Sequence, residues 1–178
     1  MTASRTLILD AAQIERKFQR IARQILEHHF DVGSLTLIGI EGQGAQMCGR
    51  LVKILREICT LDVAEERITL NKEAPLQHPI VFSGDPDALR GAAIVVVDDV
   101  LNSGRTLMYA VNHLLQHSPQ SMKTAVLIDR FHRNFPIRAD FCGLTLSTTV
   151  KEHIEVELAA GGTDAAYLED KAQASSRS

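Results

Sequence analysis

Long apolar runs are missing from this sequence of 178 residues. No stretch approaches the roughly 18 consecutive apolar residues of a membrane-spanning helix. Residues 1–10, MTASRTLILD, also lack the apolar core of a secretory signal. We therefore expect a soluble, cytoplasmic protein with no membrane partner.

Cysteine is scarce as well. Cys48, Cys59 and Cys142 are an odd number, and their spacings fit no zinc site or disulfide framework. Each lies in an apolar neighbourhood, where a free thiol behaves as a small hydrophobic side chain. We expect all three to be core residues rather than metal ligands or disulfide partners.

Two ligand classes find little support in the sequence. The chain has 19 Lys and Arg against 22 Asp and Glu, a formal net charge of −3 and a pI of about 6.1. A protein that coats nucleic acid through charge alone is strongly basic, so only a local basic patch stays open. Gly42-Gln43-Gly44 lacks the third glycine and the downstream acid of a dinucleotide-binding fingerprint, so neither flavin nor nicotinamide is expected.

What is present suffices for one sizeable core. Hydrophobic residues make up 45% of the chain, and no internal repeat divides it. We therefore expect a single domain over residues 1–168. The polar segment EDKAQASSRS, residues 169–178, predicts a flexible C-terminal tail.

Two strand-loop-helix units organise the middle of the chain. Residues 35–40 predict a buried strand that turns through Gly42 and Gly44 into a helix. Residues 93–97 predict a second buried strand, followed by a loop over residues 101–104 and another helix. This alternation predicts an α/β fold with a mainly parallel sheet and helices on both faces.

Other segments complete the α/β prediction. Asp10 is expected to cap a helix that ends near His28 and His29. Residues 71–91 have no clear period and predict a long mobile loop. Further strands are expected at residues 68–70 and 125–129, and a C-terminal hairpin around residues 161–162.

Four helical histidines, His28, His29, His113 and His117, are expected at exposed polar positions. The i, i+4 spacing of His113 and His117 permits a shared metal ion, but no glutamate follows in the pattern of a zinc-binding helix.

The stretch from Asp98 to Thr106 carries the strongest functional signal. Ligands of parallel sheets bind beyond the carboxyl ends of the strands, so residues 41–44 and 98–106 should face one crevice. Backbone N–H groups at a helix start suit a phosphate, the hydroxyls of Ser103 and Thr106 add donors, and Gly104 permits close approach.

The two acids before this loop need a different ligand. Asp98 and Asp99 would repel the phosphate, but they can accept hydrogen bonds from vicinal hydroxyls and lie near a divalent cation. A ribose 5-phosphate satisfies both halves of the motif. The alternative is that the acids merely cap a strand and the loop merely caps a helix.

These residues resemble a known family. VVVDDVLNSGRT, residues 95–106, resembles the phosphoribosyl pyrophosphate (PRPP) signature of type I phosphoribosyltransferases. LTLIGIEGQGAQMCGRLVKIL (35–55), AVLIDRFHRNFPIRADFCG (125–143) and IEVEL (154–158) followed by Gly-Gly and AAYL extend the resemblance to the PyrR family of uracil phosphoribosyltransferases and pyrimidine operon attenuators. It covers residues 7–168 and implies the type I phosphoribosyltransferase fold, with a small hood and a C-terminal hairpin.

The resemblance assigns roles to individual positions. It implies that Asp98 and Asp99 hold the ribose hydroxyls and a Mg²⁺ ion, which is bound largely through PRPP and water, and that Lys72 neutralises the leaving group. It places PRPP or nucleotide against Glu41, Gly42, Gln43, Gly44, Asp98, Asp99, Val100, Leu101, Asn102, Ser103, Gly104, Arg105 and Thr106. The base-binding hood would contain Ile128, Asp129 and Arg130. The turn at 41–44 often carries a non-proline cis peptide in the family.

The implied reaction transfers the phosphoribosyl group of PRPP to a nucleobase, uracil above all, to give UMP and pyrophosphate. It needs no protein nucleophile. The chain departs from the family at Gln43, where a basic residue is usual, and at Glu41, which puts an acid at the start of the turn. Asn102 lies where many purine enzymes place an aspartate, which disfavours a purine substrate.

The alternative function is a nucleotide-sensing regulator that binds RNA, with weak or no catalysis. Arg16, Lys17, Arg20 and Arg23 lie on the predicted solvent side of the first helix. By resemblance, the RNA-binding candidates are Gln19, Arg23, His132, Arg133 and Arg138, whose cations would contact phosphates. A solvated helix face with structural arginines is the competing explanation. The resemblance also implies a homodimer or a higher homo-oligomer.

Overall fold

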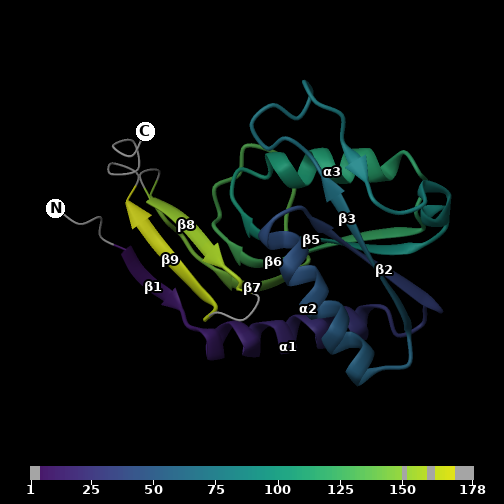
Figure 1. Cartoon of the computed structure of the whole chain (residues 1–178), viewed down its shortest axis with the longest axis horizontal. Coiled ribbons are helices and arrows are strands. Elements are labelled where there is room, and N and C mark those ends of the chain that lie inside the picture. Colours follow the sequence, from purple (N-terminus) through teal and green to yellow (C-terminus); the bar gives the residue numbers. More distant parts are fainter. Residues whose placement is uncertain (1–4, 150–151, 160–162, 171–178) are drawn as a thin grey trace.

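The computed structural model describes residues 5–149, 152–159 and 163–170. At its centre lies a six-stranded sheet with helices on both faces (Figure 1). The strand order is β4-β3-β2-β5-β6-β7, and every neighbouring pair is parallel except β3 with β4. The strands span Ser34–Ile40 (β2), Asp62–Thr69 (β3), Val81–Phe82 (β4), Ala93–Leu101 (β5), Ser121–Asp129 (β6) and Phe141–Thr145 (β7). The expected mainly parallel α/β sheet is confirmed.

Alternation along β5 divides the core into two layers. Val95 and Val97 belong to the apolar cluster that includes α1 (Ala11–His28) and α2 (Gln43–Ile58). Ile94 and Val96 belong to the cluster that includes α3 (Arg105–Leu115). Successive strand side chains point to opposite faces, so a strand covered on both sides reads as one continuous apolar run.

The first helix begins where the sequence predicts. The Asp10 carboxylate accepts a hydrogen bond from the Gln13 backbone N–H at 2.8 Å, and the Gln13 side chain accepts one from the Asp10 N–H at 2.9 Å. This reciprocal cap satisfies two backbone donors that the helix itself cannot satisfy.

A second, antiparallel sheet lies beside the first, in the order β1-β9-β8 (Figure 1). It consists of β1 (Arg5–Leu9), β8 (Glu152–Glu157) and β9 (Ala165–Asp170). The predicted C-terminal hairpin is confirmed, whereas β1 was not predicted. Ile154 and Val156 of β8 are buried in the same cluster as α1 and α2, which attaches this sheet to the main core.

Ion pairs hold the N-terminal strand to this hairpin. The Arg5 guanidinium lies 3.1 Å from Glu155 and 3.0 Å from Glu169, contacts Glu157, and stacks 3.6 Å above the Tyr167 ring. β9 extends through Asp170, two residues into the segment expected to be a tail; residues 171–178 lie outside the described residues.

Several predicted boundaries were wrong. β3 starts at Asp62 rather than near residue 68, because its exposed charged residues hide a strand that pairs with β2 along its whole length. β5 continues through both acids to Leu101. The expected loop over residues 71–91 contains β4 and a short 3-10 helix, Pro86–Leu89, while β7 was missed altogether.

Burial also differs from expectation at some cysteines and histidines. Cys48 is buried, as predicted, but Cys59 and Cys142 are only partly buried. His29 is buried rather than exposed, with Nδ1 2.8 Å from the Ile25 carbonyl oxygen and its ring beside Phe141. Burial lowers the pKa of His29, since the charged imidazolium is disfavoured there.

In the described part of the chain, no helix is long and apolar enough to cross a membrane.

Candidate active site

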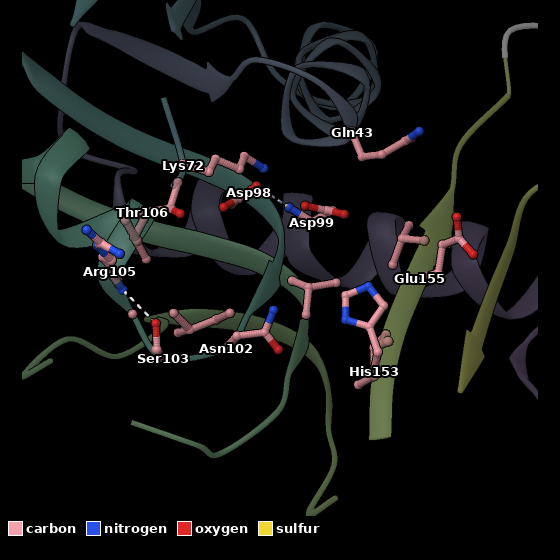
Figure 2. A pocket seen from close by; sticks show the side chains of 16 residues that line it. Gln43, Lys72, Asp98, Asp99, Asn102, Ser103, Arg105, Thr106, His153 and Glu155 are labelled. Atoms are coloured by element: carbon pink, nitrogen blue, oxygen red, sulfur yellow. Dashed lines mark hydrogen bonds between the residues drawn. The ribbon is translucent and has the colours of Figure 1, made fainter. Parts of the chain in front are cut away.

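A cavity of about 410 Å³ lies at the carboxyl end of β5 (Figure 2). It gathers residues from four places in the sequence. These are Gln43 at the start of α2, Lys72 beyond β3, residues 98–107 from the end of β5 to the start of α3, and residues 153–156 of β8. The sequence predicted the first three groups, whereas the β8 residues were missed because nothing in their pattern marks a ligand site.

The acid pair occupies the floor of this cavity. Asp98 is only 4% exposed, and its Oδ1 accepts a hydrogen bond from the Asp99 backbone N–H at 3.0 Å. Burial and the neighbouring Asp99 charge raise the pKa of Asp98 well above its usual range, while Lys72 acts in the opposite direction. A cation or hydroxyl donors beside the pair would relieve both effects, so the acids suit the middle of a sugar better than its phosphate.

The loop after the acids has the geometry of an anion site. Gly104 adopts φ 86°, and α3 begins directly after it. The first turn of a helix has backbone N–H groups without partners inside the helix, and the first turn of α3 lies at the cavity. The Ser103 hydroxyl lies 3.3 Å from the Arg105 nitrogen, whose N–H donates to it. Thr106 lines the same cavity (Figure 2).

The segment after β6, residues 134–137, packs against this loop. The Ser103 carbonyl accepts hydrogen bonds from the N–H groups of Asn134 and Phe135, at 2.9 and 3.1 Å. A Cβ at Gly104 would lie 2.5 Å from Cγ2 of Ile137. Glycine is therefore required at this position by both conformation and space.

The turn before α2 differs from what the resemblance implies. No peptide bond within the described ranges is cis, and Gly42 reaches φ 102° with trans geometry. The Gln43 side-chain oxygen accepts a hydrogen bond from the Leu158 N–H at 2.9 Å, which ties the start of α2 to the end of β8. Glu41, Gly42 and Gly44 do not line the cavity; Glu41 is exposed, and Gly44 packs against Val97 and Asp98.

A second cavity, of about 590 Å³, adjoins the first. Its lining consists of Asn102, Ser103, Arg130, Phe131, His132, Arg133, Asn134 and His153. Asn102, Ser103 and His153 line both cavities, so the two lie next to each other.

Of the three predicted hood residues, only Arg130 lines this second cavity. Ile128 is fully buried in the core. The Asp129 carboxylate accepts hydrogen bonds from the Phe131 N–H and from Arg133. Arg130 is 6% exposed and donates to the hydroxyl of Thr148 and the carbonyl of Thr149.

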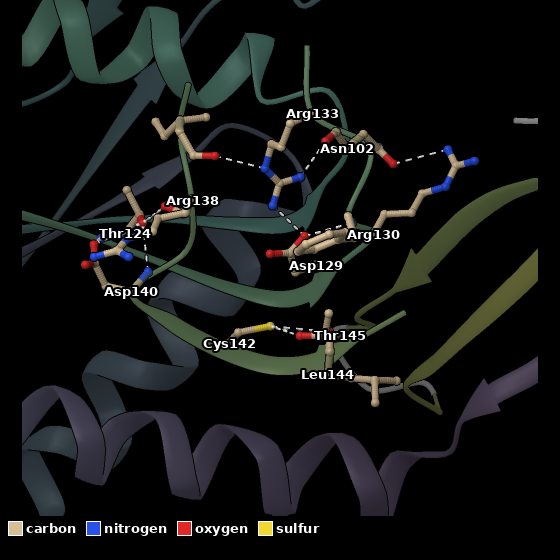
Figure 3. Close-up of polar contacts among 12 residues, drawn as sticks. Asn102, Thr124, Asp129, Arg130, Arg133, Arg138, Asp140, Cys142, Leu144 and Thr145 are labelled. Atoms are coloured by element: carbon tan, nitrogen blue, oxygen red, sulfur yellow. Dashed lines mark hydrogen bonds and ion pairs between the residues drawn. The ribbon is translucent and has the colours of Figure 1, made fainter. Parts of the chain in front are cut away.

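The RNA-binding candidates fall into two groups with different surroundings. Figure 3 shows the Arg133 guanidinium between Asn102 and Asp129, where it donates to the Asn102 carbonyl at 2.6 Å. The Arg133 Nε–H also donates to the Ile137 carbonyl, so this side chain braces the loop that precedes α3. His132 contacts the Thr148 carbonyl, while Arg138 is exposed.

The other group lies on α1, below β7 in Figure 3. Arg23 is exposed and donates to the Gln19 carbonyl at 3.2 Å. Arg20 donates to the carbonyls of Cys142 and Gly143, at 3.1 and 2.6 Å, which ties α1 to β7. Arg16 stays exposed on the same helix.

A divalent cation fits this site only if a bound ligand supplies further oxygen atoms to it. Among the residues that the structure describes, no three His, Cys, Asp or Glu side chains form a metal-binding cluster. Asp98 and Asp99 supply two carboxylates, the hard oxygen ligands that Mg²⁺ prefers, and phosphate oxygens and water would complete its octahedron. His113 and His117 have ring centroids 5.7 Å apart, with no third ligand in the described part of the chain.

Comparison with known proteins places this site in a family. Residues 4–160 match the family model of the phosphoribosyl transferase domain. The chain is 40% identical over 161 residues to the bifunctional protein PyrR of Geobacter sulfurreducens, covering 86% of this chain and 91% of that one. It is 37% identical over 164 residues to the PyrR protein of Brevibacillus brevis, covering 88% and 91%.

Solved structures show the same architecture. The hypoxanthine phosphoribosyltransferase of Trypanosoma cruzi superposes with a TM-score of 0.69 at 19% identity, covering 79% of this chain and 81% of that one. At that identity the likeness speaks for the fold alone, which is the expected type I phosphoribosyltransferase fold. With the family match and the relatives above, this chain belongs to the phosphoribosyltransferases and, among them, to the PyrR family.

Proposed function

We propose that this protein transfers the phosphoribosyl group of PRPP to uracil, giving UMP and pyrophosphate. The observation that carries the proposal is the adjacency of the two cavities, whose linings share Asn102, Ser103 and His153. A sugar phosphate held against residues 98–106 would direct its anomeric carbon toward the second cavity, where a base has room. Asn102 at the junction offers an amide instead of the carboxylate that a purine ring nitrogen would meet.

The chain's own groups supply position and charge. Asp98 and Asp99 would accept hydrogen bonds from the ribose hydroxyls, and the start of α3 would hold the 5-phosphate. The ring nitrogen of uracil forms a bond to the anomeric carbon as the bond to pyrophosphate breaks, and the proton of that nitrogen passes to water. Lys72 would face the departing pyrophosphate, whose charge Mg²⁺, when bound, neutralises further. The expected cytoplasmic location, oligomeric state and metal requirement stay predictions.

A base panel tests this proposal. The full chain, PRPP and Mg²⁺ are incubated with uracil, orotate, adenine, guanine or hypoxanthine, and pyrophosphate release is measured. We expect release with uracil and none with the purines. Pyrophosphate release with a purine would contradict the proposed reaction. So would PRPP binding without pyrophosphate release in the presence of any of the five bases. Binding of UMP without turnover would instead favour a nucleotide sensor whose reaction centre has degenerated.

A second candidate function, binding of a pyrimidine-leader RNA, is favoured by the exposed cations of α1. Arg16 and Arg23 are exposed on one helix, whereas Arg133 is committed to the phosphate loop. We propose that α1, rather than the segment around Arg133, would contact RNA phosphates.

This candidate predicts a salt-dependent affinity. Affinity for such an RNA should fall steeply with salt, and Arg16→Gln with Arg23→Gln should lower the slope of log K against log salt by about one per lost contact. The exposed Arg90, on another part of the surface, supplies the control Arg90→Gln. An unchanged slope in the α1 variants would rule this interface out.

A further inference from the structure

The second cavity contains one side chain that its neighbours do not explain. Seven of its lining residues are polar or charged: Asn102, Ser103, Arg130, His132, Arg133, Asn134 and His153. The eighth, Phe131, is the one apolar member of that lining, and its side chain is 73% exposed. A large aromatic ring at the open side of a polar cavity remains in contact with water unless a ligand covers it.

The backbone of Phe131 is also unusual. It adopts φ 61°, the left-handed region, and Ser118 is the other non-glycine residue with positive φ in the described ranges. Bulky side chains rarely adopt this conformation, and residues held in it are concentrated at functional sites.

Specific contacts hold Phe131 in place. Its N–H donates to the Asp129 carboxylate at 2.9 Å. Arg133 binds the same carboxylate and also the Asn102 carbonyl. The Phe131 backbone is therefore connected, through the side chains of Asp129 and Arg133, to the loop that is proposed to hold the phosphoribosyl group.

The position of the ring identifies its ligand. Asn102, Ser103 and His153 join the two cavities, and Figure 2 shows Asn102 and His153 near each other on the lower side of the first one. A base that bonds to the anomeric carbon from the side opposite the departing pyrophosphate would extend past these residues into the second cavity. The cavity lining lacks acidic side chains, and Phe131 gives it one apolar surface suited to a flat heterocycle.

We propose that Phe131 is a platform on which the base of the substrate or nucleotide stacks, and that its left-handed backbone presents the ring to that base. This inference deepens the proposed function and rests on it. Base contact through Phe131 would contribute to affinity for uracil and UMP and leave affinity for PRPP unchanged, because PRPP has no group in the second cavity.

Three variants test the platform. Phe131→Leu keeps apolar bulk but removes the ring, and it should raise KM for uracil and Kd for UMP about tenfold. Phe131→Gly suits the left-handed backbone, so it should lose the same affinity without a lower Tm. Phe131→Tyr keeps the ring and should stay within about twofold of the wild type. Phe30, 80% exposed and remote from both cavities, provides the control Phe30→Leu.

The readouts separate this inference from the proposed function. Calorimetry with UMP and with PRPP needs no turnover, and NMR of phenylalanine-labelled full chain should show the Phe131 ring protons shifting upfield when UMP binds. Wild-type affinities in Phe131→Leu and Phe131→Gly, or an equal loss for UMP and PRPP, would overturn the platform. UMP binding that depends on Phe131 in a chain without turnover would overturn only the transferase reaction. A wild-type chain that binds no UMP would overturn both.

Discussion

Asp98→Asn and Asp99→Asn should each lower Mg²⁺-dependent turnover of PRPP by at least about 10²-fold, without lowering the melting temperature. Asparagine keeps the shape of the side chain but removes the charge that a cation and two ribose hydroxyls would need. Asp98 is buried beside Asp99, and both effects disfavour its charged form, so the folded protein gains little from its charge. A stopped assay measures turnover, and scanning calorimetry measures Tm.

The pH dependence of stability gives this prediction a second readout. Burial and Asp99 raise the pKa of Asp98 in the folded state, so the folded protein binds this proton more tightly than the unfolded chain. The wild type therefore loses stability as pH rises from the ordinary aspartate range to the folded pKa. Asp98→Asn should melt higher than the wild type above that pKa, and the difference should shrink as pH falls.

A matched substitution at an exposed acid is the control. Asp62→Asn, at the exposed start of β3 and outside both cavities, should leave turnover unchanged. Full PRPP turnover in Asp98→Asn would show that the reaction does not need this carboxylate. A Tm loss of the size seen for a core mutation would show that the carboxylate is structural.

Gly104→Ala should impair the site through the backbone. At φ 86° alanine costs about 1 kcal/mol, and a Cβ 2.5 Å from Ile137 forces a shift costing about 1–3 kcal/mol more. The sum corresponds to a fall in Tm of roughly 4–16 °C for a domain of this size. The shift also displaces Ser103 and the start of α3, so Kd for PRPP should rise about 10²-fold.

Gly91→Ala separates the two costs. Gly91 has φ 70°, but no atom lies within 4 Å of its added Cβ, and it lies outside both cavities. This variant should show the conformational penalty alone, a Tm lower by roughly 2–4 °C, with normal PRPP binding. Equal losses in both variants, with PRPP affinity retained in Gly104→Ala, would contradict a phosphate loop at this position.

Local patterns predicted the parts of the fold that depend on neighbouring residues. The helix cap at Asp10, the buried run of β5 and the small residues before α3 were visible because their causes lie within a few positions. The strand β3 was misjudged because its outward charged residues disguise pairing with β2 and β4, which come from other parts of the chain.

Side-chain contacts between residues that are distant in sequence were harder to predict. Arg133 looked like a surface cation, yet its donors are used by Asn102, Asp129 and Ile137. His29 looked exposed, yet Phe141 lies beside it. In both cases the deciding partners are distant in sequence or lie in an irregular segment, where spacing predicts no contact.

The sequence by itself determined that this is a phosphoribosyltransferase of mainly parallel α/β architecture, since the acid pair and the small-residue loop are contiguous and carry their chemistry locally. Only the tertiary structure decided that β8 brings His153 into the linings of both cavities, that Gln43 binds the backbone just after that strand, and that Phe131 lines the second cavity. Such placements depend on how separate strands and loops pack, because burial and hydrogen bonding act between residues that the sequence keeps far apart.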